Sequence, residues 1–215
     1  MATFVLIHGA GDVGWYWHLV EAELRGRGHE TIAPDLPCDD DAAGLPEYAD
    51  AVVRAIGDRT EGLVVVGQSL GGFTAPIVCH RVPAELLVLV APMIPAPGEA
   101  VTDYWAATGY DHETTGDTID VFYQDVPSAL AAEAVERGKP QSEARLGEPS
   151  PLTKWPDVPT RVIICRDDRI FPPPYLRRVA RERLGITPDE LDGGHTPALS
   201  RPRELAALLE SYVTG

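Results

Sequence analysis

The stretch of residues 63–78 places a serine between two apolar runs. Its first half, residues 63–66, is rich in β-branched side chains and flanked by glycines, which is typical of a buried strand. Its second half is small and apolar and predicts a helix. Between them, Gly67-Gln-Ser-Leu-Gly71 fits the Gly-x-Ser-x-Gly pattern, in which a tight strand–turn–helix lifts a serine hydroxyl above the sheet. Ser69 is therefore the candidate nucleophile.

A serine hydroxyl is a weak nucleophile until a general base removes its proton, and a histidine suits this task near neutral pH. The sequence has six histidines, and His195 stands apart from the others. It lies in a glycine-containing loop after the last strand-like run and before the last helical pattern. Because parallel sheets place their sites beyond the carboxyl ends of strands, we expect His195 to be the base.

The base in turn needs an orienting acid. The strand-like run of residues 162–165 ends in Arg-Asp167-Asp168-Arg, a pair of carboxylates at the end of a predicted strand. Chain order and residue type do not choose between Asp167 and Asp168. One of the two is expected to hold the histidine, while the other can pair with an arginine.

Acyl transfer also needs backbone donors for a developing oxyanion. One is expected from the residue after the nucleophile, Leu70. The other is expected from the glycine-rich loop after the first strand, His8-Gly-Ala-Gly11. The same loop lacks the G-x-G-x-x-G register, with an acidic residue at the right distance, of a dinucleotide site.

Strand-like and helical patterns alternate through most of the 215 residues, which predicts one domain built from βαβ units around a mainly parallel sheet. Strands are predicted at residues 4–7, 31–33, 63–66, 86–90 and 162–165, with a weaker one near 186–191. Helices are predicted at 17–27, 47–56, 69–80, 175–184 and 203–213. The fold class is α/β with helices on both faces of the sheet.

The alternation is interrupted once, over residues 92–156, where prolines bracket a segment without a convincing strand. It holds short helical patterns near 117–125 and 128–137 and too few apolar residues for a core of its own. We expect residues 1–91 and 157–215 to form the core domain and 92–156 to be an inserted helical lid (cap).

The composition restricts the partners. A net charge of −15, from 33 acidic and 18 basic residues, argues against binding nucleic acid or anionic membranes. Three separated cysteines and the lack of an export leader or membrane-length apolar run favour a cytoplasmic protein with reduced thiols. A small-molecule substrate is expected, with no cofactor and no metal.

Together, Val5-Leu-Ile-His-Gly-Ala-Gly11, the serine pentapeptide, Cys165-Arg-Asp-Asp168-Arg-Ile-Phe-Pro172 and Gly193-Gly-His195 resemble the α/β-hydrolase superfamily across essentially the whole chain. The order serine, aspartate, histidine is the order of that fold. The opening His-Gly-Ala-Gly-Asp-Val-Gly-Trp15 looks most like the plant methylesterase and hydroxynitrile-lyase branch and its bacterial esterase relatives.

The resemblance adds residue roles. The aspartate followed by a proline a few residues later is the acid in that family, which implies Asp168, and the residue after His-Gly donates to the oxyanion, which implies Ala10. The chain starts at the strand before the oxyanion loop, without the family's first hairpin, so six strands are expected. Lyases of the branch carry a lysine after the histidine and a threonine in the oxyanion loop, where this chain has Thr196 and Gly9.

Aromatic and sulfur-containing side chains near the predicted site could line an apolar pocket for a small aromatic or medium-length acyl group. The five expected in it are Phe73, Met93, Trp105, Phe122 and Phe171.

These residues predict a serine hydrolase that cleaves a small ester, thioester or lactone through an acyl-enzyme. A lyase or cyclase with the same three residues is the first alternative. A ligand-binding receptor or helper protein that retains them is the second, because a fold alone does not determine function. Oligomeric state and substrate identity are not predicted.

Overall fold

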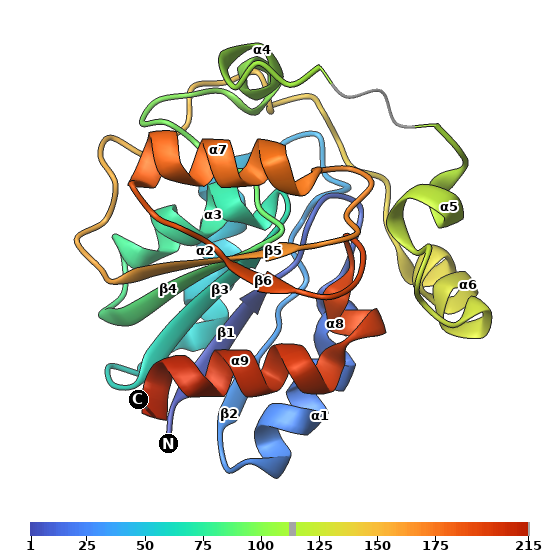
Figure 1. Ribbon diagram of the computed structural model, residues 1–215. Helices are drawn as coiled ribbons and strands as arrows, with labels where there is room; N and C mark the ends of the chain where they lie inside the picture. The colour runs from blue at the N-terminus through green and yellow to red at the C-terminus, as the bar shows by residue number, and fades with distance from the viewer. Residues whose placement is uncertain (112–114, 215) are drawn as a thin grey trace.

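The computed structural model describes residues 1–111 and 115–214 of the chain. Its centre is a six-stranded parallel sheet with strand order β2-β1-β3-β4-β5-β6 (Figure 1). The strands are β1 (Thr3–Ile7), β2 (Glu30–Ile32), β3 (Leu63–Gln68), β4 (Ala84–Val90), β5 (Thr160–Cys165) and β6 (Asp189–Leu191). The predicted α/β fold with six parallel strands is confirmed.

Helices cover both faces of this sheet. Their bounds are α1 (His18–Gly26), α2 (Leu45–Ile56), α3 (Gly71–Cys79), α7 (Pro173–Leu184), α8 (Pro197–Ser200) and α9 (Pro202–Thr214), with a 3-10 turn η1 (Gly14–Trp17) before α1. All five predicted core helices are present, with their ends shifted by up to two residues. The four-residue α8 was not predicted, because Thr196-Pro-Ala-Leu-Ser-Arg-Pro reads as a loop.

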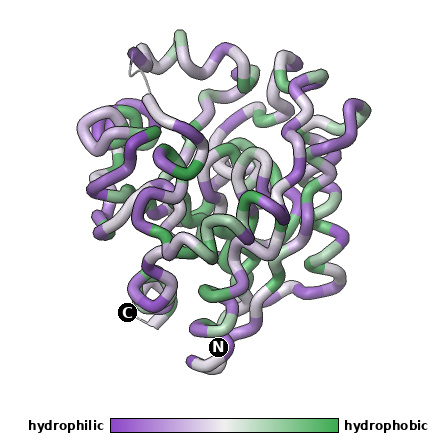
Figure 2. Tube along the Cα trace, turned by 90° about the vertical axis from the view of Figure 1, so that its right-hand side faces the viewer, coloured by the Kyte–Doolittle hydropathy of each residue, from purple (hydrophilic) through white to green (hydrophobic). Residues whose placement is uncertain are grey.

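Two apolar clusters separate the faces. Alternate residues of β1 point to opposite sides, so that Val5 packs with α2, α3 and α7, while Phe4 packs with α1 and α9. Hydrophobic residues accordingly gather in the interior and hydrophilic ones along the outer turns (Figure 2). Burial on both faces explains why the central strands read as continuous apolar runs instead of alternating ones.

The segment of residues 92–156, of which 112–114 lie outside the described residues, contains η2 (Val101–Asp103), α4 (Tyr104–Ala107), α5 (Thr118–Phe122) and α6 (Ser128–Arg137). Its buried side chains join the core in place of forming a separate one. Tyr104 and Leu146 belong to the cluster with α2 and α3, and Tyr123 and Ala131 to the cluster with α1 and α9.

The strand order reverses between β1 and β3. The chain passes from β1 outward to β2, then returns to form β3 on the other side of β1, with Ile7 beside Gly67 at the end of the register. The loops after these two strands therefore emerge side by side at the carboxyl edge. This reversal is where open α/β sheets form ligand sites.

None of the helices in residues 1–111 and 115–214 is long and apolar enough to span a bilayer.

Candidate active site

Ser69 occupies the turn between β3 and α3 in a left-handed backbone conformation, with φ of 50°. For a residue with a Cβ this conformation is strained and persists only where the surroundings hold it. Here the Ser69 amide donates to the Val90 carbonyl at 3.1 Å, and the Ser69 carbonyl accepts from Gly72 and Met93, both at 3.0 Å. These three hydrogen bonds fix the serine between β4 and the start of α3.

The two glycines of the pentapeptide permit this turn because they let α3 approach the sheet closely. A Cβ on Gly67 would lie 2.6 Å from the Gly71 carbonyl oxygen and 2.8 Å from the Ala75 Cβ. A Cβ on Gly71 would lie 2.8 Å from the carbonyl oxygens of Ile7 and His8. Side chains at either position would push α3 away from the sheet, and the serine with it.

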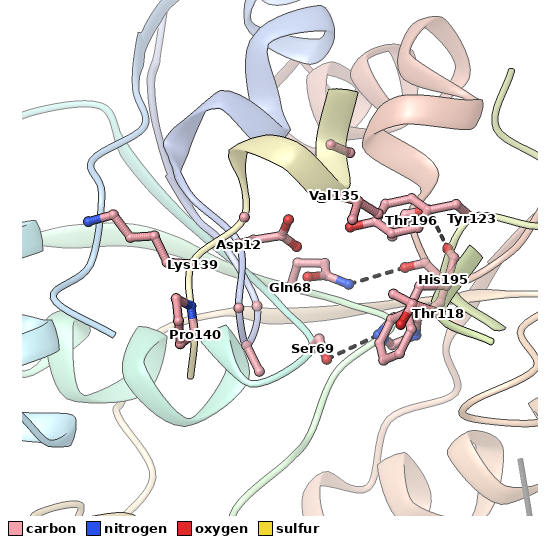
Figure 3. Close-up of a pocket in the computed structure, with 16 residues that line it drawn as sticks. Asp12, Gln68, Ser69, Thr118, Tyr123, Val135, Lys139, Pro140, His195 and Thr196 are labelled. Carbon is pink, nitrogen blue, oxygen red and sulfur yellow. Dashed lines mark hydrogen bonds between the residues drawn. The ribbon is translucent and has the colours of Figure 1, made fainter. Parts of the chain in front are cut away.

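His195, in the loop after β6, links Ser69 to Asp168. Its Nε2 lies 3.0 Å from the Ser69 Oγ, and its Nδ1 lies 2.8 Å from the Asp168 Oδ2 (Figure 3). The imidazole and the Asp168 carboxyl are both buried, while Ser69 is partly exposed. The structure thus brings together the three residues predicted as nucleophile, base and acid.

Asp168 has its carboxylate fully engaged. The second oxygen, Oδ1, accepts from the backbone amides of Ile170 at 2.8 Å and Phe171 at 2.9 Å. Asp167, the alternative acid, is exposed, and its amide donates to the Gly193 carbonyl at 3.0 Å. The turn after β5 therefore leaves Asp167 exposed and buries Asp168 beside His195.

Two further contacts position the histidine. The Gln68 amide donates from Nε2 to the His195 carbonyl at 3.1 Å, which ties the end of β3 to the loop after β6. The ring of Phe171 meets the imidazole edge to face with centroids 5.0 Å apart, and Phe122 does the same at 5.7 Å. His195 is therefore held through its backbone carbonyl by Gln68 and at its ring by Phe171 and Phe122.

The loop after β1 lies against the serine. His8 is buried in it, accepting from the Leu36 amide at 3.0 Å on Nε2, with Nδ1 2.8 Å from the Gly9 carbonyl oxygen. Burial lowers the pKa of His8 to about 4, so the imidazole is neutral and serves to shape the loop. Throughout the described residues, the backbone amides of Ala10 and Leu70 have no acceptor. Both are free to donate to a ligand.

A cavity of about 460 Å³ opens on Ser69 and His195. It is lined by the loop of residues 9–12 and by residues 118–123 and 134–140 of the 92–156 segment, where the Lys139 amide donates to the Gly11 carbonyl at 2.9 Å. Of the five side chains expected in a substrate pocket, Phe122 lines this cavity. The structure places the others elsewhere: Phe73 and Met93 lie in the core, Phe171 is buried against His195, and Trp105 packs on Phe171 at its partly exposed edge.

Sequence reasoning missed several residues of the cavity wall. Val135, Lys139 and Pro140 come from the end of α6 and the turn after it, and their positions follow from how the segment folds back. Asp12 is different, because it belongs to the glycine-rich loop already singled out. A carboxylate inside that loop was a signal that could have been used.

Asp12 lines the cavity in an unusual state. Within the parts of the chain that the structure describes, its carboxylate has neither a hydrogen-bond donor nor an ion-pair partner. Burial raises the pKa of this carboxyl to about 7, an effect that the neighbouring His195 opposes.

Across residues 1–111 and 115–214, no group of three or more His, Cys, Asp or Glu side chains is arranged to hold a metal ion.

The parallel sheet, the serine on a strained strand–turn–helix and the histidine beside it define a protein of the α/β-hydrolase class. The chain belongs to the alpha/beta hydrolase family, whose sequence pattern matches residues 4–208.

The relatives agree with the branch that the opening motif predicted. Methyl jasmonate esterase 1 of Vitis vinifera is 24% identical over 98% of this chain and 96% of its own length. The probable esterase PIR7A of Oryza sativa is 34% identical, over 45% of this chain, so the alignment spans only 41% of the rice protein. Among solved structures, polyneuridine aldehyde esterase superposes with a TM-score of 0.84 at 18% identity, covering 99% of both chains.

Proposed function

We propose that this protein hydrolyses small carboxylic esters through an acyl-enzyme on Ser69. The observation that carries the proposal is the buried, continuous array from Asp168 through His195 to Ser69, open to a cavity at the serine. The relatives named as esterases support the same reaction class. Thioesters and lactones share the acyl chemistry and belong to the same proposal.

In the proposed reaction, the Ser69 oxygen attacks the ester carbonyl carbon while His195 Nε2 takes the hydroxyl proton. Collapse of the tetrahedral intermediate breaks the bond to the alcohol oxygen, which receives that proton from His195. Water then attacks the acyl-enzyme with the same histidine as base, and the acid leaves as Ser69 regains its proton. Asp168 holds the imidazole in the tautomer that accepts on Nε2.

The oxyanion would be bound by the free amides of Ala10 and Leu70. Such a donor contributes roughly 3 kcal/mol to transition-state stabilisation in serine proteases. We assign residues 92–156 the role of a lid, since α5 and the end of α6 form the outer wall of the cavity. The protein needs no cofactor for this reaction, and its three buried, free cysteines fit the reducing environment of the cytoplasm.

Two observations weigh against the lyase alternative. Where lyases of the related branch carry a threonine, this chain has Gly9, and a Cβ there would lie 2.6 Å from the Gln68 Oε1 and 3.0 Å from the Ser69 Cβ. After the histidine, Thr196 donates its hydroxyl to the Phe122 carbonyl at 2.7 Å, so it offers no cation to a departing anion. An open loop with free amides suits a tetrahedral ester intermediate better than a cyanohydrin.

The first test is covalent labelling of Ser69. A fluorophosphonate probe, followed by intact-mass spectrometry, should add one adduct to the wild type and none to Ser69→Ala. The same variant should lose ester turnover by roughly 10⁴- to 10⁶-fold, because only oxyanion and binding effects remain. Labelling that persists in Ser69→Ala would place the nucleophile elsewhere.

A second assay separates hydrolysis from lyase chemistry. We expect turnover of short phenyl and nitrophenyl esters and no cyanide from mandelonitrile above background. Cyanide release that depends on Ser69, without ester turnover, would favour the lyase.

A further inference from the structure

The loop after β1, which lines the cavity, carries a carboxylate that the reaction does not use. Asp12 lies four residues after His8 in the loop that supplies the Ala10 amide, and Figure 3 shows its side chain at the cavity, across from Thr196 and Tyr123. Asp12 is half-buried, and a carboxylate that has lost part of its hydration is stabilised when it pairs with a cation. Asp12 has no such partner among the residues that the structure describes.

Three other polar side chains of this cavity already have partners for their donor groups. The Lys139 ammonium points away from the serine (Figure 3) and lies 3.4 Å from the Asp39 carboxylate. The Thr196 hydroxyl is used by the Phe122 carbonyl, and the Gln68 amide donates to the His195 carbonyl. The Asp12 carboxyl therefore faces a cavity in which the described cation, Lys139, lies beside Asp39 instead.

We propose that Asp12 is a specificity residue that binds a protonated amine in the alcohol or acyl part of the ester substrate. This inference rests on the proposed ester hydrolysis and adds a substrate class to it. A substrate ammonium would supply the missing donor and the missing counter-charge together. Anionic esters would be repelled, and neutral ones would leave the carboxylate unpaired.

Groups facing Asp12 come from several elements: His195 after β6, Tyr16 of η1, Tyr123 after α5 and Cys38 in the loop after β2. Burial raises the pKa values of both tyrosines and of the cysteine, so these three remain uncharged near neutral pH. Lys139 lines the same cavity. His195 takes part in the reaction of every ester, so its contribution cancels in the ratio of kcat/KM for two matched esters. That ratio therefore reports on Asp12.

The test compares matched esters of the same shape that differ in one charge. In the alcohol part the pair is 2-(dimethylamino)ethyl acetate and 3-methylbutyl acetate. In the acyl part it is methyl 4-(dimethylamino)butanoate and methyl 5-methylhexanoate. We expect one pair to show kcat/KM about 10- to 100-fold higher for the ammonium ester near pH 8, which is the size of a charge-assisted hydrogen bond.

This preference should shrink as the pH falls through about 7, because Asp12 then becomes a neutral acid while the tertiary amine stays protonated. In Asp12→Asn the ratio of kcat/KM for the two esters should be near one and should not change with pH. The matched control is Asp58→Asn, which removes the same charge from an exposed position and should keep the preference.

A binding measurement removes the dependence on turnover. The Ser69→Ala variant should bind the favoured ammonium ester about 10-fold or more tighter than its neutral isostere by calorimetry, and the difference should vanish in Ser69→Ala/Asp12→Asn. Equal affinities, or a preference that survives Asp12→Asn, would overturn the role of Asp12. Failure of the wild type to hydrolyse any ester, with the binding preference intact, would instead overturn the proposed hydrolysis.

Discussion

Two carboxylates close to His195 are treated in opposite ways by the fold. Asp168, after β5, has three hydrogen-bond donors: the His195 imidazole and the amides of Ile170 and Phe171. Asp12, after β1, has none in the described part of the chain, and burial raises its pKa to about 7. The carboxylate oxygens thus accept hydrogen bonds in the loop after β5 and, among the described residues, accept none in the loop after β1.

The difference separates two tasks. A carboxylate whose acceptors are all used cannot bind a substrate without breaking the array that holds it, so Asp168 can only orient. A carboxylate that lines a cavity without partners contributes nothing to holding the loop, and it remains available to a ligand. Residue type alone would not have distinguished the two; their hydrogen bonds do.

The largest effect should come from removing the saturated carboxylate. Asp168→Asn should lower kcat/KM by about 10⁴-fold, because an amide favours the wrong imidazole tautomer. The neighbouring change Asp167→Asn should alter it only a few-fold, since that side chain is exposed. Steady-state kinetics on one ester measures both variants, and equal small losses would mean that the orienting acid is not Asp168.

Removing the open carboxylate should instead affect stability, with a definite pH dependence. The folded pKa of Asp12 is raised from 3.8 to about 7, so the folded state holds this proton more tightly and its stability falls as pH rises between these values. Asp12→Asn should be the more stable protein above that range, by about 1–3 kcal/mol, and should lose this advantage below about pH 4.

Chemical denaturation at several pH values tests this prediction, with Asp58→Asn as the control. His8, whose lowered pKa makes the fold lose stability as pH falls from about 6.5 toward about 4, contributes equally to both proteins and cancels in the difference. A difference in unfolding free energy that does not change with pH would mean that Asp12 is solvated in both states.

A smaller effect is expected from the residue that ties the histidine loop to β3. Gln68→Met keeps the length of the side chain but loses the donor to the His195 carbonyl. A neutral hydrogen bond contributes about 1 kcal/mol, so kcat should fall roughly 5- to 10-fold while KM changes little. Unchanged kcat, or a loss confined to KM, would show that the loop after β6 is held without Gln68.

The sheet was predictable because the central strands are buried on both faces and appear as β-branched runs. The shortest strands were harder: β6 covers only Asp189–Leu191, at the edge, where polar residues weaken the pattern. In the 92–156 segment, α5 and α6 were predicted near their observed positions. The four-residue α4 was not, since Tyr104-Trp-Ala-Ala is too short for a periodic signal.

The residues of the site likewise differ in how well the sequence predicts them. Ser69, Asp168 and His195 lie at strand ends, where local sequence determines position, and the structure brings them together. The cavity wall depends on how a long insertion folds back, which no local pattern specifies. Phe73 illustrates the limit, because an aromatic residue four positions after the serine suits a pocket as well as a core, and it is fully buried in the core.

The placement of the 92–156 segment bears on how such proteins can be recombined. Within α5, Val121 packs with the cluster beneath α2 and α3, and Tyr123, just past its end, packs with the cluster beneath α1 and α9. The segment therefore closes both halves of the interior as well as one wall of the cavity. A replacement for residues 92–156 taken from a relative would have to match two apolar surfaces at once. We therefore expect single-residue changes on the cavity wall to shift selectivity more readily than exchange of the whole segment.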